Sequence, residues 1–118
     1  MNTTTTQQVK AFLQRLKSKA TVFQIIYLDK RPKNAETLGK LDITPNARDQ
    51  IIRNLSVQDY YRGPRPEDFY GGDSEMWEFG KNVNDEEVYI KVTLGQSSKP
   101  VICISFHIAE RPISYPFK

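Results

Sequence analysis

The chain has 118 residues, 38% of them hydrophobic and 26% charged, which is typical of a single globular domain over residues 1–118 with its own core. One cysteine and one histidine exclude an internal disulfide and leave no metal-binding cluster, so no metal or other cofactor is expected. The polar N-terminus has no recognisable signal peptide, and no run of residues approaches a membrane span. We therefore expect a protein of the reducing cytoplasm without a membrane partner.

The net charge of +3 is divided unevenly along the chain. Residues 1–56 hold ten Lys or Arg against four Asp or Glu, whereas residues 57–118 hold seven against ten. A basic half can attract phosphate groups, as nucleic-acid-binding proteins do. Lysines that only solvate helix faces would produce the same excess of positive charge. Charge alone favours this second interpretation over nucleic-acid binding.

A helix followed by a strand is predicted at the start of the chain. Thr4 or Thr5 can cap the helix, because each is followed three residues later by a glutamine that completes a capping box. Residues 21–28 are rich in β-branched and aromatic side chains and predict the strand. Between them, apolar residues recur at helical spacing up to an expected end near Ala20: Val9, Phe12, Leu13 and Leu16.

Two further helices are predicted before the sheet. Asn34 can cap a short helix over residues 35–40. Thr44 followed by Pro45 is typical of a helix start, and this helix should end near Leu55.

Irregular segments are predicted in two places. After residues 56–61, which suit an edge strand or an extended segment, residues 62–72 hold two prolines and three glycines and predict a loop that carries Arg62. Residues 109–118 hold two prolines, which oppose strand pairing, and predict an extended tail. Apolar side chains indicate that this tail docks on another surface: Ile113, Tyr115 and Phe117.

Alternating apolar and polar residues predict three antiparallel strands over 75–81, 88–94 and 102–108, with a turn at 82–85. The apolar members share one face: Trp77, Phe79, Val88, Ile90, Val92, Leu94, Ile102, Ile104, Phe106 and Ile108. The predicted register pairs Leu94 with Ile102, Val92 with Ile104, Ile90 with Phe106, Tyr89 with His107, and Lys91 with Ser105.

The polar side chains of these strands share the opposite face. Glu78 falls opposite Tyr89 or, after a slip of two residues, opposite Lys91. In either register these three residues share one face with His107. Two further residues are expected there: Cys103 and Ser105. The whole pattern predicts an α+β domain, a small antiparallel sheet backed by two to three helices on one face and open on the other.

The open face suits the cleavage of RNA without a metal, in which a ribose 2′-hydroxyl attacks the adjacent phosphate. The imidazole of His107 can act as general acid, because histidine exchanges protons near neutral pH. Glu78 can serve as base or orienting group, and Tyr89 as an orienting phenol. Arg62 and Lys91 can bind the phosphate and stabilise its developing charge.

Plainer interpretations apply to each of these residues alone. A single histidine on a strand is more often structural, and the other polar residues can form a solvated cross-strand ladder. A non-catalytic module that binds protein or RNA on the sheet face is the main alternative, and a small structural protein is a third. Nucleophilic catalysis by Cys103 is conceivable, but nothing in the sequence marks its thiol as activated.

Four short motifs, in order and spacing, resemble the MqsR family of bacterial type II toxins: residues 59–62 (Asp-Tyr-Tyr-Arg), 77–78 (Trp-Glu), 88–91 (Val-Tyr-Ile-Lys) and 104–107 (Ile-Ser-Phe-His). The resemblance covers roughly residues 38–107. It implies a RelE-like fold and an RNA endonuclease that cleaves messenger RNA, with the ribosome as a further candidate partner.

The resemblance also implies a site and a partner. The family's functional positions fall on Arg62, Glu78, Tyr89 and His107, of which Tyr89 alone keeps the residue type of the best-known members. Trp77, beside Glu78 in its motif, joins Lys91 as an expected substrate-binding residue. The implied partner is a cognate DNA-binding antitoxin, for which open strand edges and the aromatic tail are candidate docking elements: Tyr115 and Phe117.

Overall fold

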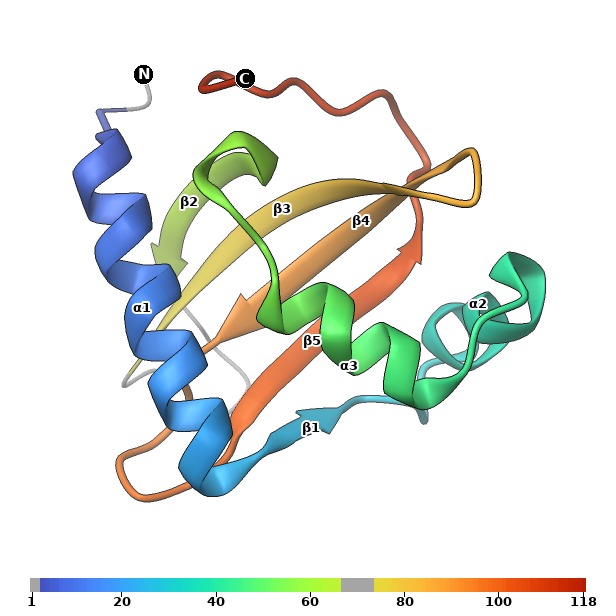
Figure 1. Ribbon diagram of the computed structural model, residues 1–118, viewed down its shortest axis with the longest axis horizontal. Helices are drawn as coiled ribbons and strands as arrows, with labels where there is room; N and C mark the ends of the chain where they lie inside the picture. The colour runs from blue at the N-terminus through green and yellow to red at the C-terminus, as the bar shows by residue number, and fades with distance from the viewer. Residues whose placement is uncertain (1–2, 67–73) are drawn as a thin grey trace.

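The computed structural model describes residues 3–66 and 74–118 (Figure 1). Three α-helices, one short 3-10 helix (Val57–Asp59) and five strands lie in these ranges. Their bounds are α1 (Thr6–Phe23), β1 (Ile25–Tyr27), α2 (Pro32–Leu41), α3 (Pro45–Arg53), β2 (Tyr60–Pro66), β3 (Glu75–Val83), β4 (Glu86–Thr93) and β5 (Val101–Ile108).

The described strands form one sheet in the order β1-β5-β4-β3-β2. β1 runs parallel to β5, and all other neighbours are antiparallel. Helices α1 and α3 cover one face, and the main hydrophobic core lies between them and the sheet (Figure 1). The predicted α+β class with helices on one face is confirmed. The sheet is mixed because a long connection lets β1 enter beside β5 in the same direction.

Helix α1 begins as predicted and ends later than predicted. The Thr5 hydroxyl accepts a hydrogen bond from the Gln8 amide at 3.2 Å, and the Thr5 amide donates to the Gln8 side chain at 2.8 Å, which completes the capping box. The helix continues to Phe23, so the strand predicted over residues 21–28 is wrong in its first part. Thr21 is accommodated in the helix by donating to the Lys17 carbonyl at 2.9 Å, and local context here overrides β propensity.

The two following helices differ in how well their starts were predicted. The Thr44 hydroxyl accepts from the Ala47 amide at 3.0 Å, which confirms the start of α3. That helix ends at Arg53, two residues before the predicted end. In α2 the N-cap is Arg31, because Pro32 fixes the first helical position, so the capping role predicted for Asn34 is wrong.

Asn34 instead joins α2 to the sheet. Its side chain is buried, donates to the carbonyls of Leu28 (3.0 Å) and Ile104 (2.9 Å), and accepts from the Phe106 amide (3.1 Å). The bond to Phe106 satisfies a backbone group of β5 that would otherwise be buried without a partner.

Replacing Asn34 with alanine is expected to lower the free energy of unfolding by about 2 kcal/mol, because the Phe106 amide would stay buried and unpaired. Asn46→Ala is the matched control, since Asn46 is an exposed asparagine in the first turn of α3 and should change little. Urea unfolding measures both. Equal stability of the two variants would contradict the role given to Asn34.

The β3–β4 hairpin follows the predicted pattern. Asn84 and Asp85 form the turn with φ of 50° and 69°, the left-handed values that the favoured two-residue hairpin turns require. Of the two predicted registers, the one that pairs Glu78 with Lys91 is observed.

The β4–β5 register contains a bulge that the alternating pattern did not reveal. Tyr89 pairs with His107 and Lys91 with Ser105 as predicted, but Val92 pairs with Cys103, so Ile104 is an extra residue. The predicted pairs of Val92 with Ile104 and of Leu94 with Ile102 are therefore wrong. Cys103 turns into the core rather than onto the open face, and burial raises the pKa of its thiol to about 12.

The segment predicted as a loop over residues 62–72 begins as strand. β2 extends to Pro66 at the edge of the sheet, so Arg62 lies on a strand; residues 67–73 are outside the described ranges. Prolines fit here because an edge strand has one side without a pairing partner. Of residues 56–61, the middle forms the 3-10 helix and the end begins β2.

The C-terminal tail docks on the sheet of its own chain. The Ile113 amide donates to Glu87 at 3.0 Å, the Tyr115 hydroxyl donates to Glu87 at 2.9 Å, and the Phe117 ring stacks on Tyr60 at 5.3 Å between centroids. The aromatic rings expected to dock on an antitoxin are thus engaged within the chain. Tyr115 and Ile113 lie directly over Gly80 of β3.

Substituting Gly80 with alanine is expected to displace the tail, because the new Cβ would lie 2.5 Å from the Tyr115 hydroxyl and 2.7 Å from Ile113 Cδ1. The Ile113 amide should then exchange its hydrogen faster. Gly39→Ala is the control, since nothing lies within 4 Å of its Cβ position and alanine favours a helix. Unchanged exchange in Gly80→Ala would show that the tail is not held in this way.

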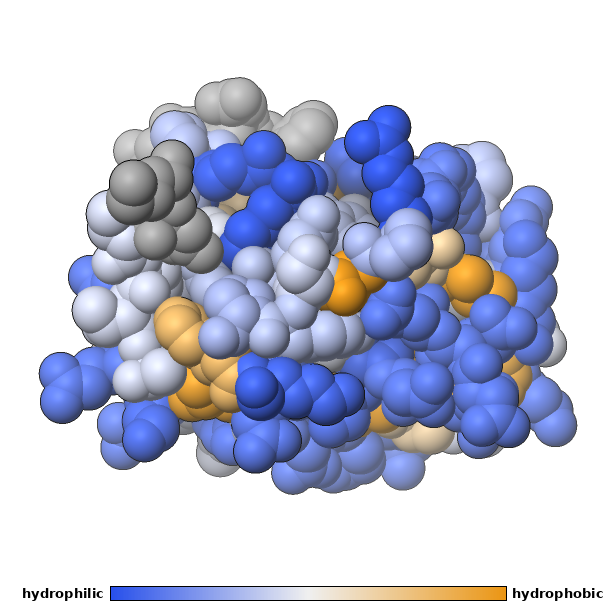
Figure 2. All heavy atoms as spheres, turned by 90° about the horizontal axis from the view of Figure 1, so that it is seen from above, coloured by the Kyte–Doolittle hydropathy of each residue, from blue (hydrophilic) through white to orange (hydrophobic). Residues whose placement is uncertain are grey.

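The surface seen in Figure 2 is mainly hydrophilic, with apolar side chains in small separate patches. Large apolar residues are exposed near the end of α1 and on β1: Val22, Phe23 and Ile26. No helix among the described residues is long and apolar enough to cross a membrane. Within the same ranges, no group of three or more His, Cys, Asp or Glu side chains could hold a metal ion.

Candidate functional site

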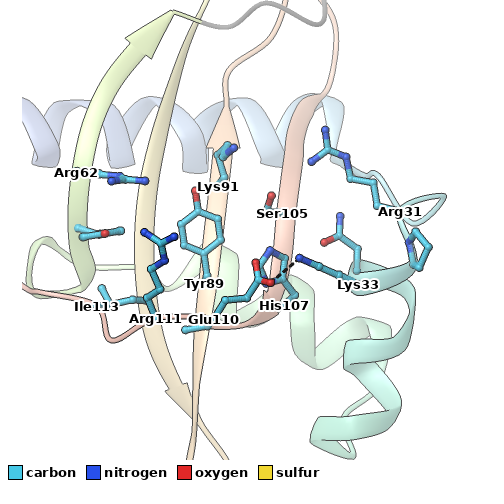
Figure 3. A pocket seen from close by; sticks show the side chains of 14 residues that line it. Arg31, Lys33, Arg62, Tyr89, Lys91, Ser105, His107, Glu110, Arg111 and Ile113 are labelled. Atoms are coloured by element: carbon cyan, nitrogen blue, oxygen red, sulfur yellow. Dashed lines mark hydrogen bonds and ion pairs between the residues drawn. The ribbon is translucent and has the colours of Figure 1, made fainter.

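The sheet face opposite α1 brings together five of the six residues predicted for a site. Figure 3 shows four of them: Arg62, Tyr89, Lys91 and His107. The five come from four adjacent strands: Arg62 on β2, Glu78 on β3, Tyr89 and Lys91 on β4, and His107 on β5. The sixth, Trp77, lies elsewhere. It belongs to the core, is 8% exposed, and stacks on Phe12 with 4.6 Å between ring centroids. This position separates Trp77 from the other five.

Glu78 is the centre of a hydrogen-bond network beneath this face. Its side chain has no exposed surface, and three donors reach its oxygens: Arg62 Nε at 2.9 Å, Tyr89 Oη at 2.5 Å and Arg65 at 2.6 Å. A buried carboxylate requires such partners, because removing its charge from water is costly. The network in turn fixes the two arginines of the edge strand and the phenol of Tyr89.

The network shifts the pKa values of its members in opposite directions. Burial favours a raised pKa for Glu78, but the hydrogen bonds from Tyr89 and Arg62 outweigh burial, so the pKa of Glu78 is lowered. The pKa of Tyr89 is raised, first by burial and then by its hydrogen bond to Glu78. A carboxylate with a lowered pKa and occupied oxygens is a poor proton acceptor. Of the two roles predicted for Glu78, this geometry favours the orienting one.

His107 is half-buried beside Tyr89, with 5.3 Å between their ring centroids. Its Nδ1 lies 3.0 Å from the Ile108 carbonyl oxygen. Because a carbonyl oxygen can only accept a hydrogen bond, Nδ1 carries a hydrogen. The nitrogen that can gain or lose a proton toward a ligand is therefore Nε2.

Lys91 is half-buried on the other side of the network, with its Nζ 6.0 Å from the centroid of the Tyr89 ring. Burial lowers the pKa of Lys91, and the positive charges of Arg31, Arg65 and Arg62 also lower it, against the attraction of Glu78. The charge of Lys91 is thus opposed by three arginines around it.

A hollow of about 570 Å³ opens over these residues, bordered by β2, β4, β5, the first turn of α2 and the start of the tail (Figure 3). Its lining includes five Lys or Arg side chains and one carboxylate: Arg31, Lys33, Arg62, Lys91, Arg111 and Glu110. Ser105 and His107 complete the wall formed by β5. Such a surface favours an anionic ligand.

Sequence reasoning missed several members of this site: Arg31, Lys33, Tyr61, Arg65, Glu110 and Arg111. Arg65, three residues after Arg62, would point to the opposite face of a regular strand. It reaches Glu78 because the β2–β3 register shifts between Arg62 and Arg65, which no local pattern reveals. The residues from α2 and the tail had no local signal, because their approach to the sheet depends on the packing of distant segments.

Compared with protein-family models, curated proteins and solved structures, the chain matches none of them. The resemblance to MqsR toxins therefore rests on its four short motifs, and function has to be argued from the chemistry of the hollow.

Proposed function

We propose that this chain is a metal-independent endoribonuclease that cleaves single-stranded RNA in the hollow over the open sheet face. One observation carries the proposal: a histidine with a fixed tautomer stands beside an oriented phenol in a hollow lined by five cationic side chains and one carboxylate. Proton transfer and charge stabilisation are the two requirements for cleavage through the 2′-hydroxyl.

Each residue has a separate role in the proposed reaction. Arg62, held by Glu78, binds the phosphate and stabilises the negative charge that develops on its oxygens. Lys91 borders the same phosphate as a second cation, and solvent water takes the proton of the 2′-hydroxyl. That oxygen bonds to phosphorus while the bond to the 5′-oxygen breaks. Protonated His107 gives its Nε2 proton to the departing 5′-oxygen, leaving a 2′,3′-cyclic phosphate.

The test is cleavage of a defined single-stranded RNA by the purified protein in excess EDTA. A second substrate, with a 2′-deoxy residue at the cleaved position, is the control. We expect products that end in a cyclic phosphate from the first substrate and none from the second at that position. Equal cleavage of both substrates, or cleavage that EDTA abolishes, would refute this mechanism.

A second candidate function is a non-catalytic RNA-binding module that uses the same hollow. The observation in its favour is the Glu78 network, in which three donors occupy a carboxylate that could otherwise act as base. Binding of RNA without cleavage in the experiment above would support the module.

The wider role, a toxin held in check by a cognate DNA-binding antitoxin, is proposed from the resemblance of the four motifs to MqsR. Expression of the chain alone in bacteria should then arrest growth by degrading messenger RNA. Undisturbed growth at a verified level of folded protein would contradict a toxin role.

A further inference from the structure

Two groups of cations lie on opposite sides of the hollow. Figure 3 shows Arg62 at the side of β2 and, beyond β5, Arg31 and Lys33 at the start of α2. Tyr89, Lys91 and Arg111 lie between them. Arg62 is anchored on β3 through Glu78, whereas the α2 group starts beyond β5. Two strand intervals separate β3 from β5, about 10 Å at the usual strand spacing. One phosphate is too small to contact both groups.

The two groups differ in how they are neutralised. Arg62 shares the buried Glu78 carboxylate. In the α2 group, Lys33 pairs with Glu110 at 2.6 Å, and both side chains are 62% exposed. An ion pair this exposed contributes little to stability, so a phosphate can displace Glu110 from Lys33. Among the described residues that line the hollow, Glu110 is the one carboxylate.

Both groups act on Lys91, which lies between them. Burial is the first cause that lowers its pKa, and the positive charges of Arg31 on one side and Arg62 on the other lower it further. Among the described residues that line the hollow, Lys and Arg outnumber Asp and Glu, so positive charges repel one another there. A ligand with a single charge would relieve this repulsion at one side. A chain of successive phosphates would relieve it at both.

We propose that the hollow binds two backbone phosphates of a single RNA strand, the scissile one beside Arg62 and Lys91 and a neighbouring one beside Arg31 and Lys33. This subsite rests on the proposed function in so far as RNA is the ligand. It identifies the substrate as a strand that crosses the sheet from β2 to α2, rather than a mononucleotide or a single phosphodiester.

The first test measures binding of a non-cleavable 2′-O-methyl RNA oligonucleotide at several salt concentrations. Each phosphate contact on a single strand contributes about 0.7 to the slope of log K against log salt. The double variant Arg31→Gln/Lys33→Gln should lower the slope by about 0.7 and weaken binding about tenfold. Glu110→Gln should tighten binding, because it removes the competitor of Lys33. Lys40→Gln, at the other end of α2, is the matched control and should bind as wild type does.

The second test compares cleavage of a dinucleoside monophosphate with that of a trinucleoside diphosphate. Wild type should cleave the longer substrate faster, and in the double variant the ratio of the two cleavage rates should fall toward one. A wild-type salt slope in the double variant would overturn the subsite. So would an acidic peptide that displaces the RNA as effectively as RNA itself does. If wild type cleaves no RNA but the slope falls as expected, the subsite stands and the proposed nuclease fails.

Discussion

His107→Ala is expected to lower the rate of RNA cleavage by about 10²–10⁴-fold, the usual contribution of one general acid or base. The fold should be unaffected, because the hydrogen bond that the imidazole makes within the described residues goes to the carbonyl of its own neighbour, Ile108. Single-turnover cleavage in EDTA measures the rate, and circular dichroism with thermal unfolding confirms the fold.

The controls for His107 separate proton transfer from binding. His107→Gln keeps a polar side chain of similar length but cannot exchange a proton, so it should lose about as much activity as the alanine variant. Both should bind 2′-O-methyl RNA within a few-fold of wild type. Wild-type cleavage by either variant would remove His107 from the mechanism, and a parallel loss of binding would make it a binding residue instead.

The strand pattern predicted more of the site than the helical half of the chain did. The alternation of side chains along each strand is enough to place Tyr89, Lys91 and His107 on one face. The tight turn at 84–85 brings Glu78 beside them. These features depend on contacts between residues close in sequence. Once two strands pair with one apolar face, the position of every polar side chain between them is fixed.

The bulge in β5 shows where a prediction from alternating side chains fails. One extra residue at Ile104 reverses the alternation, and Cys103 enters the core although its spacing predicts the open face. Nothing in the composition of residues 101–108 marks the bulge. Ile104 and Phe106 are both bonded through their backbone to Asn34 of α2, so the irregular segment meets an element about seventy residues earlier in the chain.

Two further differences concern the borders of the site. The prolines after Arg62 predict a loop, yet an edge strand tolerates them. The cations of α2 reach the hollow because Asn34 fixes that helix against β5, which no local pattern indicates. Sequence alone could thus predict the centre of the site and Arg62 at one border, but not the border formed by α2 and the tail.

The largest expected effect on stability belongs to Glu78→Gln. The substitution keeps the shape of the side chain but removes the charge that pairs with Arg62 and Arg65 beneath the sheet face. Breaking a buried ion pair usually costs 3–5 kcal/mol. Both arginines are about half exposed, at 47% and 48%, so water can solvate them and the lower end, about 3 kcal/mol, applies. Urea unfolding near neutral pH measures this loss.

The difference between wild type and Glu78→Gln should depend on pH in a defined direction. Because the pKa of Glu78 is lowered in the folded state, the unfolded chain binds more protons in the acid range, and wild-type stability falls as pH drops through the folded pKa. The advantage over the variant is therefore full above the ordinary pKa of glutamic acid and shrinks below it. Glu75→Gln, an exposed position on the same strand, is the control and should change stability by less than about 0.5 kcal/mol. Equal stability of the two variants, or a difference that does not change with pH, would mean that the carboxylate of Glu78 does not hold the site together.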